Sequence, residues 1–180
     1  MMRWLLLILG GTLLGGIVHL ATMLILPRTA TQDAYARLAP SAQVNAMSPI
    51  PAPTPQNAPI PFMDPAFAVA VCRYDLAKGP IKFSAPVSTA YTSVSFYTRN
   101  GVAYYAINDR AAGRRVIELS LMTTQQREDL PADEDVTAAD RLIVESPTKI
   151  GLIVLRALAP EPGLMPMVRD TIAAAKCIPQ

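Results

Sequence analysis

The chain opens on a long apolar segment and continues as short runs of apolar and polar residues. Between Trp4 and Leu26, 23 residues carry no formally charged side chain. At about 1.5 Å of rise per residue they span roughly 34 Å as a helix, enough to cross a hydrocarbon core of about 30 Å. The pattern predicts a membrane helix, preceded by Arg3 and ended by Pro27 and Arg28.

A cleaved signal peptide is the competing interpretation of this segment. Its apolar region would be about 7–15 residues long and would end at small residues. Here the run is longer, and large residues from Met23 to Leu26 occupy its exit. We therefore expect an uncleaved anchor, and the positive groups at the amino end favour a cytoplasmic amino terminus.

Strand patterns begin after Pro65. Apolar and β-branched runs bounded by turn residues predict strands at 67–74, 81–84, 91–98, 102–107, 116–121, 141–145 and 150–158. The last of these is apolar almost throughout and is expected to be central. Asn100-Gly101 predicts a two-residue hairpin turn. Such a turn places Val94, Phe96, Tyr105 and Ile107 on a core face, and Ser95, Tyr97 and Tyr104 on the opposite face.

Helical patterns are short. They predict helices at 31–38, 124–130 and 164–177, the second with Thr123 or Thr124 as its N-cap. Residues 131–140 are predicted to form an acidic loop. The predicted fold is mainly β with flanking helices: an N-terminal transmembrane helix, an antiparallel β-sandwich or jelly-roll-like domain, and a C-terminal helix. The expected divisions are an anchor at 1–28, a short helix and proline-rich linker at 29–65, and a β-rich periplasmic domain at 66–180.

Proline is concentrated in the predicted linker. Eight of the 17 prolines lie between Pro40 and Pro65, where they favour extended polyproline II backbone. Three interpretations stay open: a stiff spacer, a ligand for a proline-recognition module, or an arm packed along the domain. The apolar residues Ile50, Ile60, Phe62 and Met63 are what an arm would bury.

Two cysteines, Cys72 and Cys177, stand 105 positions apart. Two cysteines in an exported domain usually pair, and such a loop would constrain the unfolded chain by about 4–5 kcal/mol. Two separate buried thiols are the alternative if the domain is cytoplasmic. A catalytic thiol is not expected, because the only histidine lies in the apolar segment.

One face of the apolar segment carries small and polar residues. Gly11, Gly15 and His19 are spaced by four, and Thr22 follows by three, which places all four on one helical face. A small-xxx-small pattern lets a second helix approach closely, and an intramembrane histidine prefers a polar partner. The alternative is that the glycines are ordinary membrane-helix residues and that His19 bonds locally.

Charge and motifs point away from several functions. Lys and Arg number 16 against 14 Asp and Glu, without a basic run, so no nucleic-acid partner is expected. No dinucleotide fingerprint, P-loop, CxxC or histidine metal site occurs, and no cofactor or catalytic set is predicted. One cluster of polar residues remains: Arg73, Asp75, Asn108, Asp109 and Arg110. These residues either stabilise turns or form a small anion or sugar site at one end of the sandwich.

Several motifs in order carry a family resemblance. Cys72-Arg73-Tyr74-Asp75-Leu76, the stretches 79–86 and 93–97, and Ile107-Asn108-Asp109-Arg110 resemble the bacterial family of domain of unknown function 1254. The segment from His19 to Thr22 followed by Pro27-Arg28, and the ending 173–177, resemble its short membrane-anchored alphaproteobacterial members.

The resemblance implies a single-pass protein of the bacterial inner membrane with its C-terminal domain in the periplasm. It also implies a partner carrying the companion domain of unknown function 1214, and it supplies no catalytic residues. We therefore expect an interaction protein that assembles with a membrane partner. The alternative is one half of an envelope enzyme or ligand-binding module completed by another chain.

Overall fold

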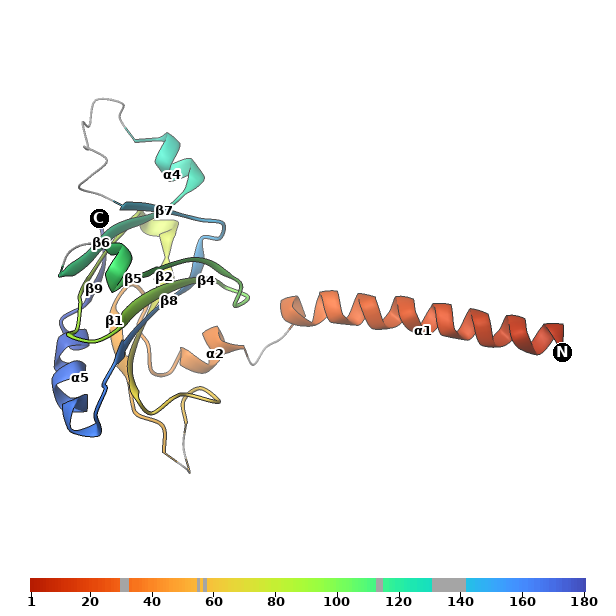
Figure 1. Cartoon of the computed structure of the whole chain (residues 1–180). Helices are drawn as coiled ribbons and strands as arrows, with labels where there is room; N and C mark the ends of the chain where they lie inside the picture. The colour runs from red at the N-terminus through yellow and green to blue at the C-terminus, as the bar shows by residue number, and fades with distance from the viewer. Residues whose placement is uncertain (30–32, 55, 57, 113–114, 131–141) are drawn as a thin grey trace. The chain divides into compact units, whose positions relative to one another are not determined.

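The computed structural model describes the chain except residues 30–32, 55, 57, 113–114 and 131–141 (Figure 1). It contains two compact units, 1–33 and 34–180. The first is the helix α1 (Met2–Thr29), whose Met2–Leu26 part has a mean hydropathy of 2.0. Among the described residues this is the one helix long and apolar enough to cross a bilayer, and its length and position also fit a signal sequence.

Two β-sheets form the second unit, as expected for a sandwich. The first has the order β1 (Met47–Ile50), β2 (Phe67–Asp75), β8 (Ile150–Leu158), β4 (Thr92–Thr98) and β5 (Ala103–Asn108), with every pair antiparallel. The second has the order β7 (Leu142–Ser146), β6 (Val116–Thr123), β3 (Ile81–Pro86) and β9 (Lys176–Pro179). Here β6 and β7 run parallel, a departure from the antiparallel prediction. The acidic loop predicted at 131–140 lies outside the described residues.

The main core lies between the two sheets (Figure 1). Alternate residues of each strand point into it, including Cys72 and Tyr74 of β2 and Val94 and Phe96 of β4. The ring of Phe96 packs edge to face against the ring of Phe83 in the other sheet, and their centroids are 6.2 Å apart. Such aromatic contacts add about 0.5–1.5 kcal/mol to the burial of the rings.

Strand β8 is the central strand of its sheet, as predicted from its apolar run. Ile153 and Leu155 face the main core, whereas Leu152 and Val154 point to the other side, where only 3% and 8% of their surface is exposed. A strand that is covered on both faces loses the usual alternation of apolar and polar residues.

The cover on that second face is the proline-rich segment, which we call the arm (residues 34–65). It comprises α2 (Ala34–Leu38), β1 and the chain up to Pro65. Strand β1 pairs with β2 from Met47↔Cys72 to Ile50↔Val69. A second, smaller core results: Leu38, Ala42, Ile50, Val71, Leu152 and Val154, with Tyr35, Ile60, Met63, Val69 and Tyr97 against it. The arm interpretation therefore holds over the spacer for Ile50, Ile60 and Met63, whereas Phe62 is exposed, against expectation. The compact unit begins at Ala34.

The β4–β5 hairpin differs from the predicted two-residue turn. The Thr98 amide donates to the Val102 carbonyl and the Gly101 amide donates to Thr98, so the loop has three residues and ends on Gly101 at φ +80°. A bulge between Phe96 and Tyr97 then restores the expected register, Phe96↔Tyr105 and Val94↔Ile107.

The bulge also moves Tyr104. Its ring packs 6.3 Å from Phe96 on the core side, so the prediction that Tyr104 lies on the face opposite to Phe96 was wrong. A bulge places two residues of one strand opposite a single residue of its partner. Tyr104 and Tyr105 thus both reach the core side of the sheet.

The C-terminal helix is shorter than predicted. α5 (Met165–Ala173) buries Val168 and Ile172 in the main core. Residues 176–179 leave the helix and pair with β3 as strand β9, from Ile81↔Pro179 to Ser84↔Lys176. Cys177 therefore lies on a strand and not at a helix end. The remaining short helices are α3 (Asp109–Ala112) and α4 (Thr124–Glu128), the second capped by Thr123 as predicted.

Candidate functional site

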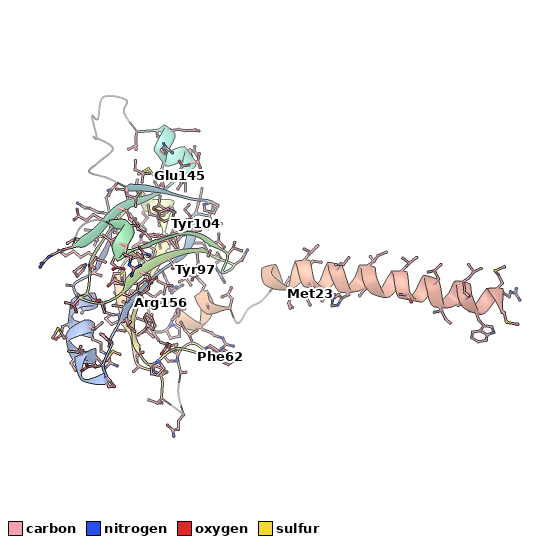
Figure 2. The ribbon with its side chains drawn as sticks, viewed as in Figure 1. Met23, Phe62, Tyr97, Tyr104, Glu145 and Arg156 are labelled. Carbon is pink, nitrogen blue, oxygen red and sulfur yellow. A yellow bond between two sulfur atoms is a disulfide. The ribbon has the colours of Figure 1, made fainter. Side chains whose placement is uncertain are left out.

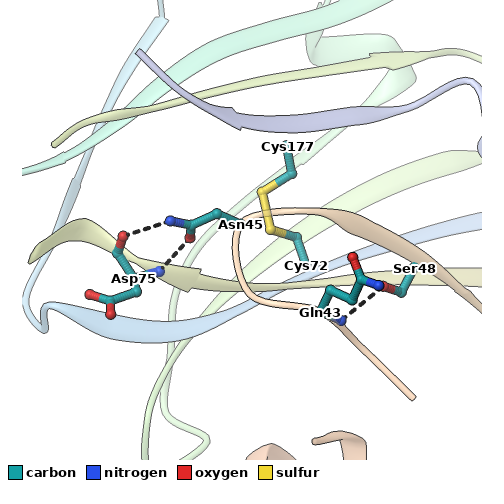
Figure 3. Close-up of a disulfide and its surroundings, with 6 residues drawn as sticks. All are labelled: Gln43, Asn45, Ser48, Cys72, Asp75 and Cys177. Carbon is teal, nitrogen blue, oxygen red and sulfur yellow. Dashed lines mark hydrogen bonds between the residues drawn. A yellow bond between two sulfur atoms is a disulfide. The ribbon is translucent and has the colours of Figure 1, made fainter. Parts of the chain in front are cut away.

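A disulfide joins Cys72 of β2 to Cys177 of β9 (Figure 3). It links one sheet to the other through the main core, and its Cα atoms are 6.4 Å apart. Beside it the Asn45 side chain exchanges two hydrogen bonds with the Asp75 backbone: Nδ2 donates to the carbonyl (3.0 Å) and Oδ1 accepts from the amide (2.7 Å). The predicted pairing is thus present, and it indicates a domain that folds outside the reducing cytoplasm.

The polar cluster predicted from the sequence is split between the two ends of the first sheet. Strands β2 and β5 run in opposite directions, so their carboxyl ends face apart. Through β8, Arg73 is in register with Tyr97 of β4, whereas Asn108 pairs with Ser93 of β4. Four residues along a strand separate these levels by about 13 Å. The five residues therefore do not form one site.

Arg73 holds the arm against the sheet. Its Nη1 donates to the Ala42 carbonyl (3.4 Å), and its guanidinium lies 4.4 Å from the Tyr35 ring centre. Arg99 lies 4.5 Å from the centre of the same ring. Such cation–π contacts contribute about 0.5–1 kcal/mol at exposed sites. Buried Arg73 Nε has no hydrogen-bond partner among the described residues.

The other members of the cluster form local backbone bonds. Asp75 Oδ1 accepts from the Ala77 amide (2.9 Å) and caps a 3₁₀ turn. Asn108 Oδ1 accepts from the Ala111 amide (3.0 Å) at the start of α3. Asp109 Oδ1 accepts from the Thr92 amide (3.5 Å), and Arg110 is exposed. These contacts are typical of turn and cap residues.

Asn108 nevertheless borders a depression that the sequence did not reveal. One row of residues crosses the sheet on the side away from the main core: Val69, Arg156, Ser93 and Asn108, one from each of four strands. Paired residues of antiparallel strands point to the same face. Two adjoining cavities of about 440 and 320 Å³ open here, and Arg156 and Phe67 line both of them. An arginine in an otherwise apolar strand was the signal that could have identified Arg156.

A buried polar network crosses the main core close to the hairpin. Tyr104 Oη donates to Tyr74 Oη (3.1 Å), which lies 3.2 Å from the Tyr97 carbonyl and 2.9 Å from Ser146 Oγ. The single proton of Tyr74 can serve only one of the last two at a time. Burial and, secondarily, the neighbouring Tyr74 raise the pKa of Tyr104 well above its ordinary value. Tyr104 therefore stays protonated at neutral pH and is unsuited to act as a base.

Gly151 makes room for this network. It pairs with Tyr74 in the sheet, and a Cβ at this position would overlap the Tyr74 hydroxyl and the Tyr97 carbonyl. A glycine in a strand interior often marks such a close approach. The hydrogen bonds of this network join strands β2, β4, β5 and β7, so its role is structural.

The other residues predicted from the sequence lie on α1. Gly11, Gly15, His19 and Thr22 are exposed on the helix. Thr22 Oγ1 donates to the Val18 carbonyl (2.8 Å), and an added Cβ at Gly11 or Gly15 would touch nothing within 4 Å. Among the residues that the structure describes, no three of His, Cys, Asp and Glu gather as metal ligands.

Comparison with known proteins identifies structures with a similar fold and a matching family. No curated protein matches the chain. The crystal structure of the VPA0106 protein from Vibrio parahaemolyticus is similar, with 13% identity and a TM-score of 0.58 over 79% of this chain and 33% of its own. That of an uncharacterised protein from Burkholderia cenocepacia has 14% identity and a TM-score of 0.47 over 71% of this chain and 34% of its own. The chain thus spans about a third of these relatives. Residues 44–179 match the family described as protein of unknown function (DUF1254), and the chain belongs to that family.

Proposed function

We propose that this protein is a single-pass component of the bacterial inner membrane, with its amino end in the cytoplasm and its domain in the periplasm. There it assembles with a membrane partner. The disulfide supports the compartment, because thiol pairs persist in the oxidising periplasm. The 25-residue segment Met2–Leu26, with a mean hydropathy of 2.0, supports an anchor. Arg3 and the terminal amine support the orientation.

One observation carries the assembly part of the proposal: the glycine and histidine face of α1. Gly11 and Gly15 leave their surroundings open, so another helix could reach the backbone there. The Thr22 hydroxyl is satisfied by its own helix. His19 is exposed on α1, and in lipid a polar side chain gains from a hydrogen-bond partner.

The partner we propose is a membrane protein carrying the companion domain of unknown function 1214, as the family resemblance suggests. Within the Vibrio protein, the part similar to this chain is about a third of a longer chain.

Site-directed photo-crosslinking tests the assembly. The co-expressed companion protein should crosslink to a probe placed at Gly15 or Thr22. Probes at Leu13 and Ile17 are matched controls, because at about 100° per residue they lie on the opposite face of the helix. A second test replaces Gly11 and Gly15 with leucine while the probe stays at Thr22, which should leave insertion intact and abolish the crosslink from Thr22.

Other outcomes would count against the proposal. Equal crosslinking from both faces, or none, would reduce α1 to a tether. Crosslinks only to a second copy of this chain would replace the partner with a homodimer. A cytoplasmic location of the C-terminal end, measured by cysteine labelling in intact cells, would overturn the topology.

A second candidate function is one half of an envelope enzyme or ligand-binding module. The cavities beside Asn108 and Arg156 favour it, since ligand sites are concave, mainly apolar and equipped with a few polar groups. Asn108 is the one member of the predicted cluster that lines them.

A further inference from the structure

The face of the first sheet that points away from the main core, which we call the outer face, is divided by chemistry. Its β2 and β8 side is apolar, with Val69, Val71, Leu152 and Val154. Its β4 and β5 side carries Ser93, Ser95 and Asn108. The register places Val154 beside Ser95 and Arg156 beside Ser93, so the boundary runs between β8 and β4.

The apolar side forms a cavity of about 440 Å³ between the arm and the sheet. Its lining is mainly aliphatic and aromatic: Leu38, Ile60, Met63, Val69, Leu152 and Val154 are representative. Asp64 is exposed at this cavity, and its Oδ1 already accepts from the Ala66 amide (2.9 Å). A cavity of this size and lining suits an alkyl chain.

The polar side forms the adjoining cavity of about 320 Å³. The hydroxyls of Ser93 and Ser95 line it, and neither makes a hydrogen bond to any described residue. Each can donate a proton to an oxygen anion. Tyr91 and Asn108 complete the polar lining.

Arg156, which is labelled in Figure 2, lines both cavities and therefore lies where they meet. It has no ion-pair partner among the described residues. A guanidinium presents a fork of donors that fits carboxylate and phosphate groups. An unpaired cation at the end of an apolar cavity is complementary to a molecule with one anionic end.

The mouth of the apolar cavity carries an exposed aromatic residue in an unusual conformation. Phe62 has φ +59°, in the left-handed region, and its side chain is 104% exposed. For a bulky apolar residue both features are unfavourable. An apolar group seated in the cavity would cover part of the ring.

A peptide strand does not fit this place. Both β8 and β4 are flanked by partners on each side, so they offer no free backbone edge for strand addition. The site must therefore recognise its ligand through side chains.

We propose that the outer face binds an amphipathic anion: a single alkyl chain in the cavity under the arm, and a carboxylate or phosphate head on Arg156, Ser93 and Ser95. This inference rests on the second candidate function and names its ligand class. It does not depend on assembly through α1.

The test uses the full chain in lipid nanodiscs, with the methionine methyl groups labelled with carbon-13. Met63 lines the apolar cavity, and Met122 in the other sheet is 2% exposed, so the pair gives a local reporter and a fold control. The probes are octanoate and octyl phosphate, with octanol for the tail alone and inorganic phosphate for the head alone. Local reporting by Met63 separates binding from partition into the nanodisc.

Octanoate and octyl phosphate should shift the Met63 resonance saturably and more tightly than octanol. Arg156→Gln should weaken both anions at least about tenfold, leave octanol within about twofold, and leave Met122 unmoved. Arg110→Gln is the matched control, an exposed arginine outside both cavities, and should change nothing.

The proposal fails if Arg156→Gln leaves anion affinity unchanged, if octanol binds as tightly as octanoate, or if Met63 does not respond. Inorganic phosphate that shifts Met63 as strongly as octyl phosphate would overturn the alkyl-chain part. If anion binding fails while the α1 crosslinks persist, only this inference is lost. If the crosslinks fail while anions bind, assembly is lost instead.

Discussion

Replacing Cys72 and Cys177 together with alanine removes the covalent link between the two sheets. Both side chains are buried, at 0% and 1% exposure, and the strands that carry them keep their pairing partners, β1 and β8 for β2 and β3 for β9. The native fold should therefore survive the change. The main effect should fall on the unfolded chain, which is free to expand once the loop is open.

The loop length sets the magnitude. For a sequence separation of 105, the chain-entropy relation gives a loss of about 16 cal/mol/K, or about 4.8 kcal/mol at 25 °C. A domain of this size is typically stable by about 5–15 kcal/mol. The double variant should thus be folded but marginal, and its two small cavities should add to the loss.

Urea unfolding of the full chain in nanodiscs measures the effect. Trp4, the single tryptophan, lies in α1, so its fluorescence does not report on the domain. Near-ultraviolet circular dichroism of the buried tyrosines does. Wild-type protein reduced with dithiothreitol is the matched control, because it keeps both sulfur atoms and loses only the bond.

The free energy of unfolding should fall by about 4–5 kcal/mol in reduced wild type. The dependence on urea should become steeper, because a larger surface is exposed in the unfolded state. A loss below about 1 kcal/mol in both reduced protein and the double variant would refute the loop argument. A large loss in the variant alone would assign the effect to packing.

Two further perturbations probe the buried polar network. Gly151→Ala should lower the free energy of unfolding by about 3 kcal/mol or more, because the added Cβ would overlap the Tyr74 hydroxyl. Gly163→Ala is the control in the same urea assay. Gly163 has open space around it, so this change should alter the free energy of unfolding by less than about 1 kcal/mol. Because burial raises the pKa of Tyr104, the unfolded chain releases this proton first, and stability should fall as pH rises above about 10. Tyr104→Phe should lower stability at pH 8 and make the decline between pH 9 and 11 shallower; an unchanged decline would contradict this role.

Local patterning was sufficient for much of the fold. The apolar run of β8 indicated a central strand, and Asn100-Gly101 located the hairpin, because burial and turn chemistry act over a few residues. The apolar helix followed from its length and lack of charge. The two cysteines, given an oxidising compartment, indicated the disulfide.

Details that depend on contacts between segments far apart in the chain could not be predicted from the sequence. The end of the C-terminal helix was misplaced, because residues 176–179 gain more from pairing with β3 than from another helical turn. The arm was ambiguous, since proline-rich chain is extended whether it is free or packed. The hairpin contained a three-residue loop and a bulge whose register shifts cancel.

The candidate site shows the same division. The sequence by itself determined that the domain has no histidine and that its strands alternate between two faces. Only the tertiary structure decided that Arg73 and Asn108 lie at opposite ends of the sheet, and that Arg156 lies between two cavities. Strand order and direction set these distances, and both result from contacts between segments far apart in the chain.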